Sequence, residues 1–303
     1  MVFLRHTDIR KANCGIGINT LQNRSGHLRE AGMDIFYEHE SDGVYTRHVR
    51  EENADGSGYT MHIHDRCEIY YFVDGEADYL VEGTVYHMRR GSLLVMRPGE
   101  VHMAKLLTNG VYERYAVNFP LSFLDDIDPE RRLMRLYTER PLGERNLYER
   151  PDYEGLLGTL CGKHEDEYER RITAYRILME ILSGLDEEFR QNSSETNKKK
   201  TRDSSLSEKI LRYVNEHIYE GLSVPFLAEK FYVSESQIGR LFKKSTGASC
   251  WEYITAKRLI AAREMIEDGE SAGAAAEKCG FGDYSSFYRA YVKRYGESPR
   301  KVL

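Results

Sequence analysis

Three histidines and a glutamate are spaced so that they could converge on one polar site. His62-Ile63-His64 is followed, after three intervening residues, by Glu68, and His102 ends the run Pro98-Gly99-Glu100-Val101-His102. Residues of equal parity share one face of a strand, so His62, His64 and Glu68 can point the same way. His102 can join them from a neighbouring strand. Three imidazoles and a carboxylate suit a divalent transition metal. The same four side chains would also suit a metal-free pocket for a polar molecule.

Further side chains could complete such a pocket. Arg97 could clamp a hydroxyl or carboxylate group, and Tyr70 and Phe72 share the inward parity of the strand. Both aromatic residues could equally belong to the core. The predicted effector-binding residues are His62, His64, Glu68, Tyr70, Arg97 and His102, and the candidate metal ligands are His62, His64, Glu68 and His102. This lining suits a sugar or a small organic acid.

Two helix-turn-helix patterns occupy the last hundred residues. In the first, residues 223–233 form one short helix, which Ser223 can cap, and residues 234–247 form a second. Ser234 to Gln237 form a capping box at its start, and Gly247 is a left-handed stop at its end. Ile238, Leu241 and Phe242 form the buried stripe of the second helix. Its exposed face carries Ser236, Gln237, Arg240, Lys243 and Lys244. A polar face followed by basic residues is typical of a helix that lies in a major groove.

The second unit repeats this plan, with a helix over residues 272–279, a turn at 280–282 and the cap Asp283. The predicted reading helix spans residues 283–295, and Gly296 ends it. It leaves exposed Tyr284, Ser285, Tyr288, Arg289 and Lys293. Between the units, residues 249–267 predict one helix of roughly 28 Å. Since major grooves on one side of DNA repeat every ~34 Å, this helix could place both reading helices in adjacent grooves. A purely structural bundle would leave Arg240 and Arg289, at matching places, unexplained.

The tail, over about residues 205–303, resembles the DNA-binding domain of the AraC/XylS family of bacterial transcription regulators. The matching motifs are Lys257-Arg258-Leu259, Ala262-Arg263, Gly280-Phe281, Phe287, Arg289, Tyr295-Gly296 and Ser298-Pro299. By this resemblance, the base-facing residues are Ser236, Gly239, Arg240, Tyr284, Ser285 and Arg289. The resemblance also implies contact with RNA polymerase and favours a homodimer.

The histidine-bearing segment resembles the two cupin motifs at all four usual ligand positions. It departs from cupin enzymes at Leu106, where those enzymes have an asparagine, and Arg97 stands before Pro98 where AraC-type sensor domains often have proline. The expected elements fit this resemblance. Short strands are predicted over residues 61–73, 77–81, 84–88, 91–96 and 111–119, with a hairpin turn at Glu82-Gly83. Such strands favour a small barrel or jelly roll.

Residues 150–190 predict helices. Leu156, Leu157 and Leu160 form one apolar stripe, and a second, with near-heptad steps, is formed by Ile172, Tyr175, Met179, Leu182 and Phe189. The second stripe could cover the barrel or form a dimer seam. Residues 191–207 are polar and lack periodicity, which predicts a flexible tether.

Charge and composition limit the class of protein. The net charge is −6, but residues 204–303 hold 15 Lys and Arg against 13 Asp and Glu, whereas the remainder holds 28 against 36. We therefore expect the acidic part to avoid DNA and phosphate contacts to come from the pairs Lys243-Lys244, Lys293-Arg294 and Arg300-Lys301. Five cysteines lack paired or metal-type spacing, and no signal-like or membrane-spanning apolar run occurs. A cytoplasmic protein with reduced thiols and no membrane partner is expected.

Together these patterns predict a two-domain α+β chain. A cupin-like β-barrel (jelly roll) with flanking helices and an N-terminal arm occupies residues 1–145, and a helical dimerisation segment occupies residues 146–190. A linker follows over 191–206, and the all-α double helix-turn-helix domain occupies 207–303. The predicted function is ligand-responsive, sequence-specific binding of double-stranded DNA, without enzyme activity. The alternatives are a cupin metalloenzyme fused to a DNA-binding tail and an effector-independent DNA-binding protein.

Overall fold

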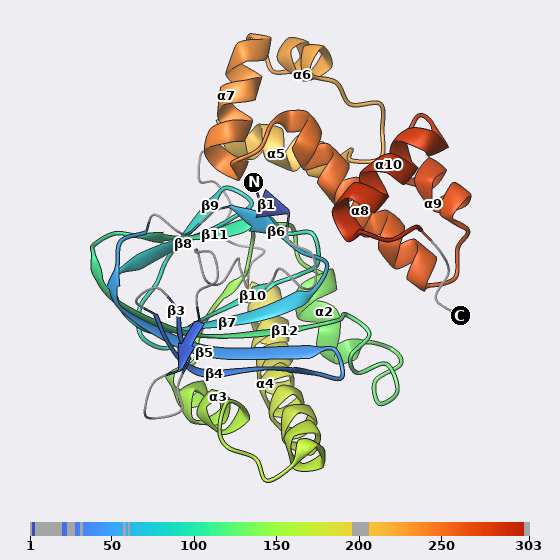
Figure 1. Ribbon diagram of the computed structural model, residues 1–303. Helices are drawn as coiled ribbons and strands as arrows, with labels where there is room; N and C mark the ends of the chain where they lie inside the picture. Colours follow the sequence, from blue (N-terminus) through green and yellow to red (C-terminus); the bar gives the residue numbers. More distant parts are fainter. Residues whose placement is uncertain are drawn as a thin grey trace.

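Two β-sheets packed face to face make up the N-terminal part of the chain, and helices make up the C-terminal part (Figure 1). The structure is a computed structural model that describes residues 2–3, 20–22, 28–30, 33–56, 59, 61–195 and 206–299. The larger sheet contains, in spatial order, β13 (Leu147–Glu149), β10 (Ser92–Met96), β7 (Cys67–Asp74), β12 (Gly110–Phe119), β5 (Val44–Ala54), β4 (Met33–Ser41), β3 (Leu28–Glu30) and β2 (Thr20–Gln22). The smaller sheet contains β1 (Val2–Phe3), β6 (His62–Ile63), β11 (His102–Leu106), β8 (Ala77–Val81) and β9 (Thr84–His87).

The predicted continuous strand over residues 61–73 is wrong in one respect, because the chain changes sheets within it. β6 ends at Ile63, a bend follows at Asp65 and Arg66, and β7 begins in the other sheet at Cys67. In one straight strand, residues four apart would lie about 13 Å apart. The bend instead folds His64 back toward Glu68. These two side chains therefore meet because the chain turns, and not because they share a parity.

The turn predicted at Glu82-Gly83 is present and joins β8 to β9. Both residues have positive φ, 50° at Glu82 and 87° at Gly83. Positive φ at both central positions is the conformation of the tight hairpin turn whose twist matches the flanking strands. It costs a glutamate more than it costs a glycine, so Glu82 holds this position against its own backbone preference.

Helices cover the outer face of the larger sheet. α3 (Glu154–Leu160) and α4 (Glu167–Glu195) pack on it, and α2 (Arg135–Thr138) closes its edge near β10 (Figure 1). The outward-facing residues Ile69, Tyr71 and Val117 lie in the same core cluster as Ile177 and Leu185 of α4.

This packing corrects the predicted dimer seam. Leu182 and Phe189 are buried against the barrel, and Tyr175 and Met179 pack on the same cluster. Ile172 alone of the stripe is exposed. The outward face of α4 carries instead Arg176, Glu180, Glu187 and Arg190. The apolar stripe of α4 therefore covers the barrel, because it packs on the apolar outer face of the larger sheet.

The C-terminal part folds as two helix-turn-helix units on a common helix. The helices are α5 (Leu206–Glu216), α6 (Val224–Lys230), α7 (Glu235–Thr246), α8 (Cys250–Glu267), α9 (Ala272–Lys278) and α10 (Tyr284–Tyr295). The predicted caps are present: Ser223, Ser234 and Asp283 each accept a backbone amide hydrogen, and Gly247 and Gly296 are left-handed. No helix begins at Ser298 or Pro299, and the rest of the predicted last helix lies outside the described residues.

Arg258 of α8 ties the two units together. Its guanidinium donates to the carbonyls of Ile218 and Gly280 at 2.7 Å and of Glu220 at 2.5 Å. Gly280 has φ of 76°, and an added Cβ there would lie 2.4 Å from the Tyr219 carbonyl oxygen. The turn of the second unit thus sits directly against the loop that follows α5, and a larger residue at 280 would force them apart.

Some predicted segments are only partly described. α4 runs to Glu195, five residues into the segment predicted as a linker, and residues 196–205 lie outside the described residues. Of the predicted arm at residues 1–30, only β1, β2 and β3 are described. Within the described residues, no helix is both long and apolar enough to cross a membrane.

Candidate functional site

The three histidines and the glutamate meet inside the barrel. One potential ligand atom from each of His62, His64, Glu68 and His102 lies within 4.8 Å of all the others, and all four side chains are buried. His62 of β6 is paired directly with His102 of β11. His64 Nε2 lies 2.8 Å from Glu68 Oε2, and His102 Nε2 lies 3.1 Å from the same oxygen. The fold therefore brings together the four residues whose spacing predicted a common site.

The ring of His102 is oriented by a backbone carbonyl. Its Nδ1 lies 2.8 Å from the Glu100 carbonyl oxygen, which can only accept a hydrogen bond, so Nδ1 carries a proton. Its Nε2 then faces Glu68 either as a second donor, in the imidazolium form, or as a lone pair that can bind a cation. A carbonyl on one ring nitrogen and a free lone pair on the other is the arrangement of metal-binding histidines.

Glu68 has one oxygen for the histidines and one without a partner. Burial opposes ionisation of its carboxyl group, but hydrogen bonds from His102 and His64 hold its pKa well below the usual range. Its Oε1 is buried and has no hydrogen-bond partner among the described residues. A buried unpaired oxygen costs about 1–3 kcal/mol. The donor set and this oxygen fit a divalent metal.

Asn118 belongs to the same site and was missed by the sequence analysis. It is fully buried on β12, directly opposite Glu68 of β7. Directly opposed residues project from the same face of a sheet, so its amide enters the barrel beside Glu68. Neither its Oδ1 nor its Nδ2 has a partner within the described part of the chain. A polar residue at the inward parity of the apolar run Tyr115-Ala116-Val117-Asn118-Phe119 was the signal that could have revealed it.

The aromatic residues predicted to point inward fill the barrel beyond this site. Tyr70 and Phe72 are buried, and the Tyr70 hydroxyl is hydrogen-bonded to that of Tyr112. The Tyr79 ring lies 4.6 Å from Tyr70 and stacks at 6.1 Å on His102. The space next to the histidines is therefore small.

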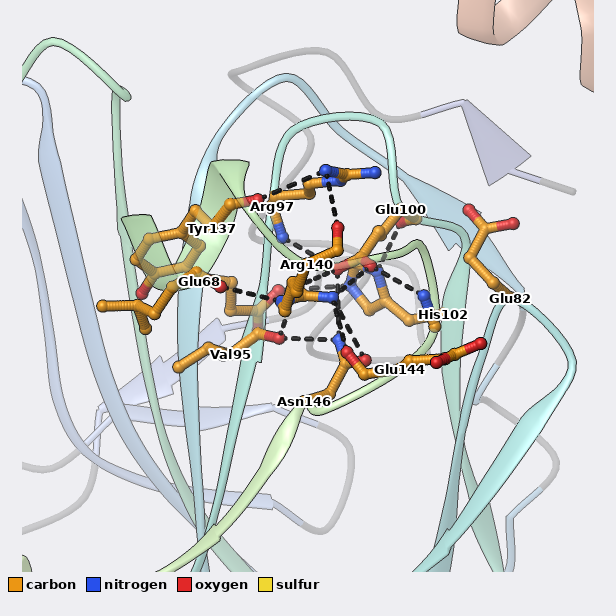
Figure 2. A network of polar contacts seen from close by, with 12 residues as sticks. Glu68, Glu82, Val95, Arg97, Glu100, His102, Tyr137, Arg140, Glu144 and Asn146 are labelled. Atoms are coloured by element: carbon orange, nitrogen blue, oxygen red, sulfur yellow. Dashed lines mark hydrogen bonds and ion pairs between the residues drawn. The ribbon is translucent and has the colours of Figure 1, made fainter. Parts of the chain in front are cut away.

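Arg97 lies elsewhere, which corrects its predicted position in the pocket. Its guanidinium donates to the carbonyls of Tyr137 and Arg140 at 3.4 and 3.2 Å, at the edge of the network in Figure 2. Arg97 lines two cavities of about 420 and 350 Å³ between the barrel and the helical domain. Its side chain leads away from Glu68 because Met96, the residue before it, takes the inward position opposite Glu68, and successive residues point to opposite faces.

A buried ion pair holds the loop that carries His102. Glu100 and Arg140 lie at the centre of Figure 2, with Arg140 Nη1 2.6 Å from Glu100 Oε1. The carboxylate also accepts from the backbone amides of Arg97 and Gly143 and from the Asn146 side chain. Burial raises the pKa of a lone carboxyl, but Arg140 lowers that of Glu100 to about 2. The pair fixes Glu100, whose carbonyl in turn fixes His102.

All the predicted DNA-contacting side chains are exposed. They lie on α7 (Ser236, Gln237, Arg240, Lys243, Lys244) and on α10 (Tyr284, Ser285, Tyr288, Arg289, Lys293). Four of them also have local partners. Gln237 accepts from the Ser234 backbone amide in the capping box, and the Ser236 hydroxyl lies 3.0 Å from that of Ser234. Lys243 donates to the Gly247 carbonyl at 3.0 Å, and Arg289 donates to the Ser286 hydroxyl at 3.3 Å. These bonds leave other donors free, since a lysine has three and the glutamine amide has two.

The basic pairs predicted for phosphate contacts are only partly available. Lys293 is exposed, but its neighbour Arg294 is buried with its guanidinium 5.3 Å from the Tyr295 ring. Arg300 and Lys301 lie outside the described residues. The exposed positive charge of the two reading helices is therefore that of Arg240, Lys243, Lys244, Arg289 and Lys293.

Comparison with known proteins matches both parts of the chain. A family model for an AraC-like ligand binding domain matches residues 47–199, and one for a helix-turn-helix domain matches residues 227–303. The HTH-type transcriptional activator RhaS of Citrobacter koseri is 24% identical over 263 residues, which cover 83% of this chain and 90% of that protein. The probable transcriptional regulator LumQ of Photobacterium leiognathi is 32% identical over 93 residues, 30% of this chain and 38% of that protein. Among solved structures, fatty acid-bound ToxT of Vibrio cholerae covers 86% of this chain and 95% of its own, with 13% identity and a TM-score of 0.37.

The Glu100–Arg140 pair leads to a prediction about stability. Glu100→Gln should lower the free energy of unfolding by about 3–5 kcal/mol, because it leaves Arg140 charged and unpaired in the interior. Since the Glu100 pKa is lowered to about 2 from 4.5, its stabilising effect is complete above pH 4.5 and is lost as the pH falls toward 2. Urea unfolding between pH 2 and 7 should show the difference between wild type and variant shrink in that acid range. The exposed Glu130→Gln is the control, with a loss under about 1 kcal/mol. An equal effect of both variants would contradict the assigned role of Glu100.

Proposed function

The chain belongs to the AraC/XylS family of transcriptional regulators, and from this we propose that its barrel holds a divalent transition metal that takes part in sensing a small oxygen-rich effector. The protein is a DNA-binding regulator with a ligand-binding domain. The finer proposal is carried by one observation, the convergence of four buried ligand atoms within 4.8 Å. His62, His64, Glu68 and His102 would hold the metal, and the metal would supply a Lewis acid that binds effector oxygens.

The chemistry of the surrounding residues supports a small organic acid as the effector. The Asn118 amide offers one donor and one acceptor beside Glu68. Because Tyr70, Tyr79 and Tyr112 fill the adjoining space, a compact molecule with carboxylate or hydroxyl groups fits better than a bulky one. A sugar remains the second candidate, since aromatic rings also line this part of the barrel. We infer that the regulated genes serve the metabolism of such a compound.

The reading of DNA is assigned to the two exposed helices. Arg240 of α7 and Arg289 of α10 occupy matching places, and the exposed Arg289 guanidinium has one local contact, 3.3 Å from Ser286 Oγ. α8, with 18 residues, spans about 27 Å between the two units. This length supports binding in successive major grooves. The homodimer and the contact with RNA polymerase stay predictions from the family resemblance, and enzyme turnover is not expected.

Metal content tests the buried site. Protein purified without nickel affinity should contain about one equivalent of transition metal, measured by plasma mass spectrometry, because three imidazoles and a carboxylate bind such ions tightly. His64→Ala should reduce the content at least tenfold. The control is His87→Ala, which removes an exposed histidine that pairs with Asp78 outside the site. Wild-type protein with less than about a tenth of an equivalent would reject the metal.

Asn118→Leu tests the effector site. Leucine has a similar volume and removes two unpaired polar atoms, so the ligand-free variant should be as stable as wild type or more stable by ~1 kcal/mol. A panel of small organic acids and sugars is then screened by thermal shift. An effector at a hundred times its dissociation constant should stabilise wild type by ~2.7 kcal/mol. The variant should lose most of this gain, and retention of the whole gain would exclude contact with Asn118.

Base reading is tested on duplexes selected from a random pool with the wild-type protein. Arg240→Ala or Arg289→Ala should each weaken binding to the selected duplex by ~1–3 kcal/mol and relax its specificity. Lys244→Ala should weaken all duplexes alike and reduce the salt slope by about one. If Arg289→Ala lost equal affinity for selected and random duplexes, its role would be restricted to phosphate contact.

A further inference from the structure

The barrel and the helical domain share one hydrophobic core. Met61, Ile63 and Val101 of the barrel lie in the same cluster as residues of α5 and α8, which include Ile210, Leu211, Val214, Tyr253 and Ile260. The turns of the barrel come close to these helices. A Cβ at Gly83 would lie 3.2 Å from a Leu211 methyl group, and one at Gly99 would lie 3.7 Å from Ile260. The two parts are thus packed directly against each other, as Figure 1 shows for α5 and α8 above β6 and β11.

Glu82 is the polar centre of this contact. It projects from the β8–β9 turn, is 6% exposed, and its carboxylate receives three hydrogen bonds from the helical domain. Lys257 Nζ donates to its Oε1, and the Tyr253 hydroxyl and Asn215 Nδ2 donate to its Oε2, the last at 3.3 Å. Lys257 is also buried, and burial lowers its pKa although Glu82 favours its charged form. The two charges compensate each other, because either one left unpaired in the buried interface would be strongly destabilising.

The interface and the histidine site are formed by neighbouring residues on opposite faces of the same segments of chain. Ile63, between His62 and His64, packs on the helical domain, and so does Val101, next to His102. Asp65, which follows His64, forms an ion pair with Arg263 of α8 at 3.1 Å. Successive side chains of a strand point to opposite faces, so a residue that enters the site has a neighbour that meets the helices. The backbone that places the imidazoles therefore also places the docking surface.

Glu82 is bonded to the strand that carries His102. Its backbone amide donates to the Val101 carbonyl at 2.9 Å, and its Oε1 accepts from the Val101 amide at 2.8 Å. Val101 precedes His102 in the chain, so a shift of His102 by a few tenths of an ångström also moves Val101. Val101 is hydrogen-bonded to both the backbone amide and the carboxylate of Glu82. The bonds between Val101 and Glu82 therefore connect the histidine site to α8 without a further element.

We propose that Glu82 is a latch that transmits the state of the histidine site to α8, the helix on which both DNA-reading units are mounted. The inference rests on the proposed function and adds its regulation. Metal at the histidines draws His62, His64 and His102 toward one centre, and Ile63, Asp65 and Val101 move with them. This movement changes the hydrogen bonds that Glu82 accepts from Lys257, Tyr253 and Asn215. The docking of α8 then changes, and with it the presentation of α7 and α10 to DNA.

The test measures binding of the full-length protein to a selected duplex with and without Co²⁺. In wild type, the metal should change the dissociation constant at least about fivefold, the lower range of allosteric coupling. In Glu82→Gln, the ratio should fall to within about twofold of unity, because the ion pair with Lys257 is lost. Small-angle scattering should show a larger radius of gyration for the variant than for metal-free wild type. Tyr253→Phe removes only one donor and should give an intermediate ratio.

Controls separate the latch from the site itself. The Co²⁺ visible spectrum and stoichiometry of Glu82→Gln should equal those of wild type, since Glu82 is not a ligand. Arg212→Ala breaks another pair across the interface, the exposed one with Glu144, and should leave the ratio unchanged. A wild-type ratio retained in Glu82→Gln would overturn the latch. Wild-type protein that binds Co²⁺ but keeps one DNA affinity would reject the coupling alone. Wild-type protein that binds no Co²⁺ would reject the metal site and, with it, the coupling.

Discussion

The structure depends on a single constraint, that a carboxylate removed from water must be surrounded by donors. Three glutamates of the barrel are almost fully buried, and each has a different partner: two histidines at one oxygen of Glu68, Arg140 at Glu100, and Lys257 at Glu82. An unpaired charge in such an interior would cost several kcal/mol. The three pairs therefore define, in turn, the buried site, the loop that supports it and the contact with the DNA-binding domain.

These three carboxylates are connected through short stretches of chain. The Glu100 carbonyl orients His102, Val101 joins Glu100 to His102, and Val101 exchanges hydrogen bonds with Glu82. Because successive side chains of an extended chain alternate between its two faces, this arrangement needs few residues between the histidine site and the DNA-binding domain. The basic residues of the helical domain fall into two groups. Arg258 and Lys257 of α8 are buried structural contacts, whereas the charges that remain for DNA lie on α7 and α10.

Local residue patterns were sufficient to place the caps and stops of the helix-turn-helix units. Ser223, Ser234, Gly247, Asp283 and Gly296 act where their types predict, because capping is decided within one turn of a helix. The apolar stripe of α4 was harder to interpret. Its spacing suits a partner helix or a sheet equally, and only the presence of the large sheet beside it shows that it covers the barrel.

The sequence by itself determined the helix caps and turns and singled out the four residues that converge inside the barrel. Caps and turns depend on hydrogen bonds between residues a few positions apart, so the residue types reveal them. It could not place Arg97, show that Asn118 lies opposite Glu68 or indicate the role of Glu82. Arg97 points away from the site because Met96 takes the inward position opposite Glu68. Asn118 joins the site through pairing with a strand about fifty residues away, and Glu82 meets a lysine 175 residues away. These positions follow from long-range pairing and burial, which only the tertiary structure decides, because no short-range pattern records which distant group will share a low-dielectric interior.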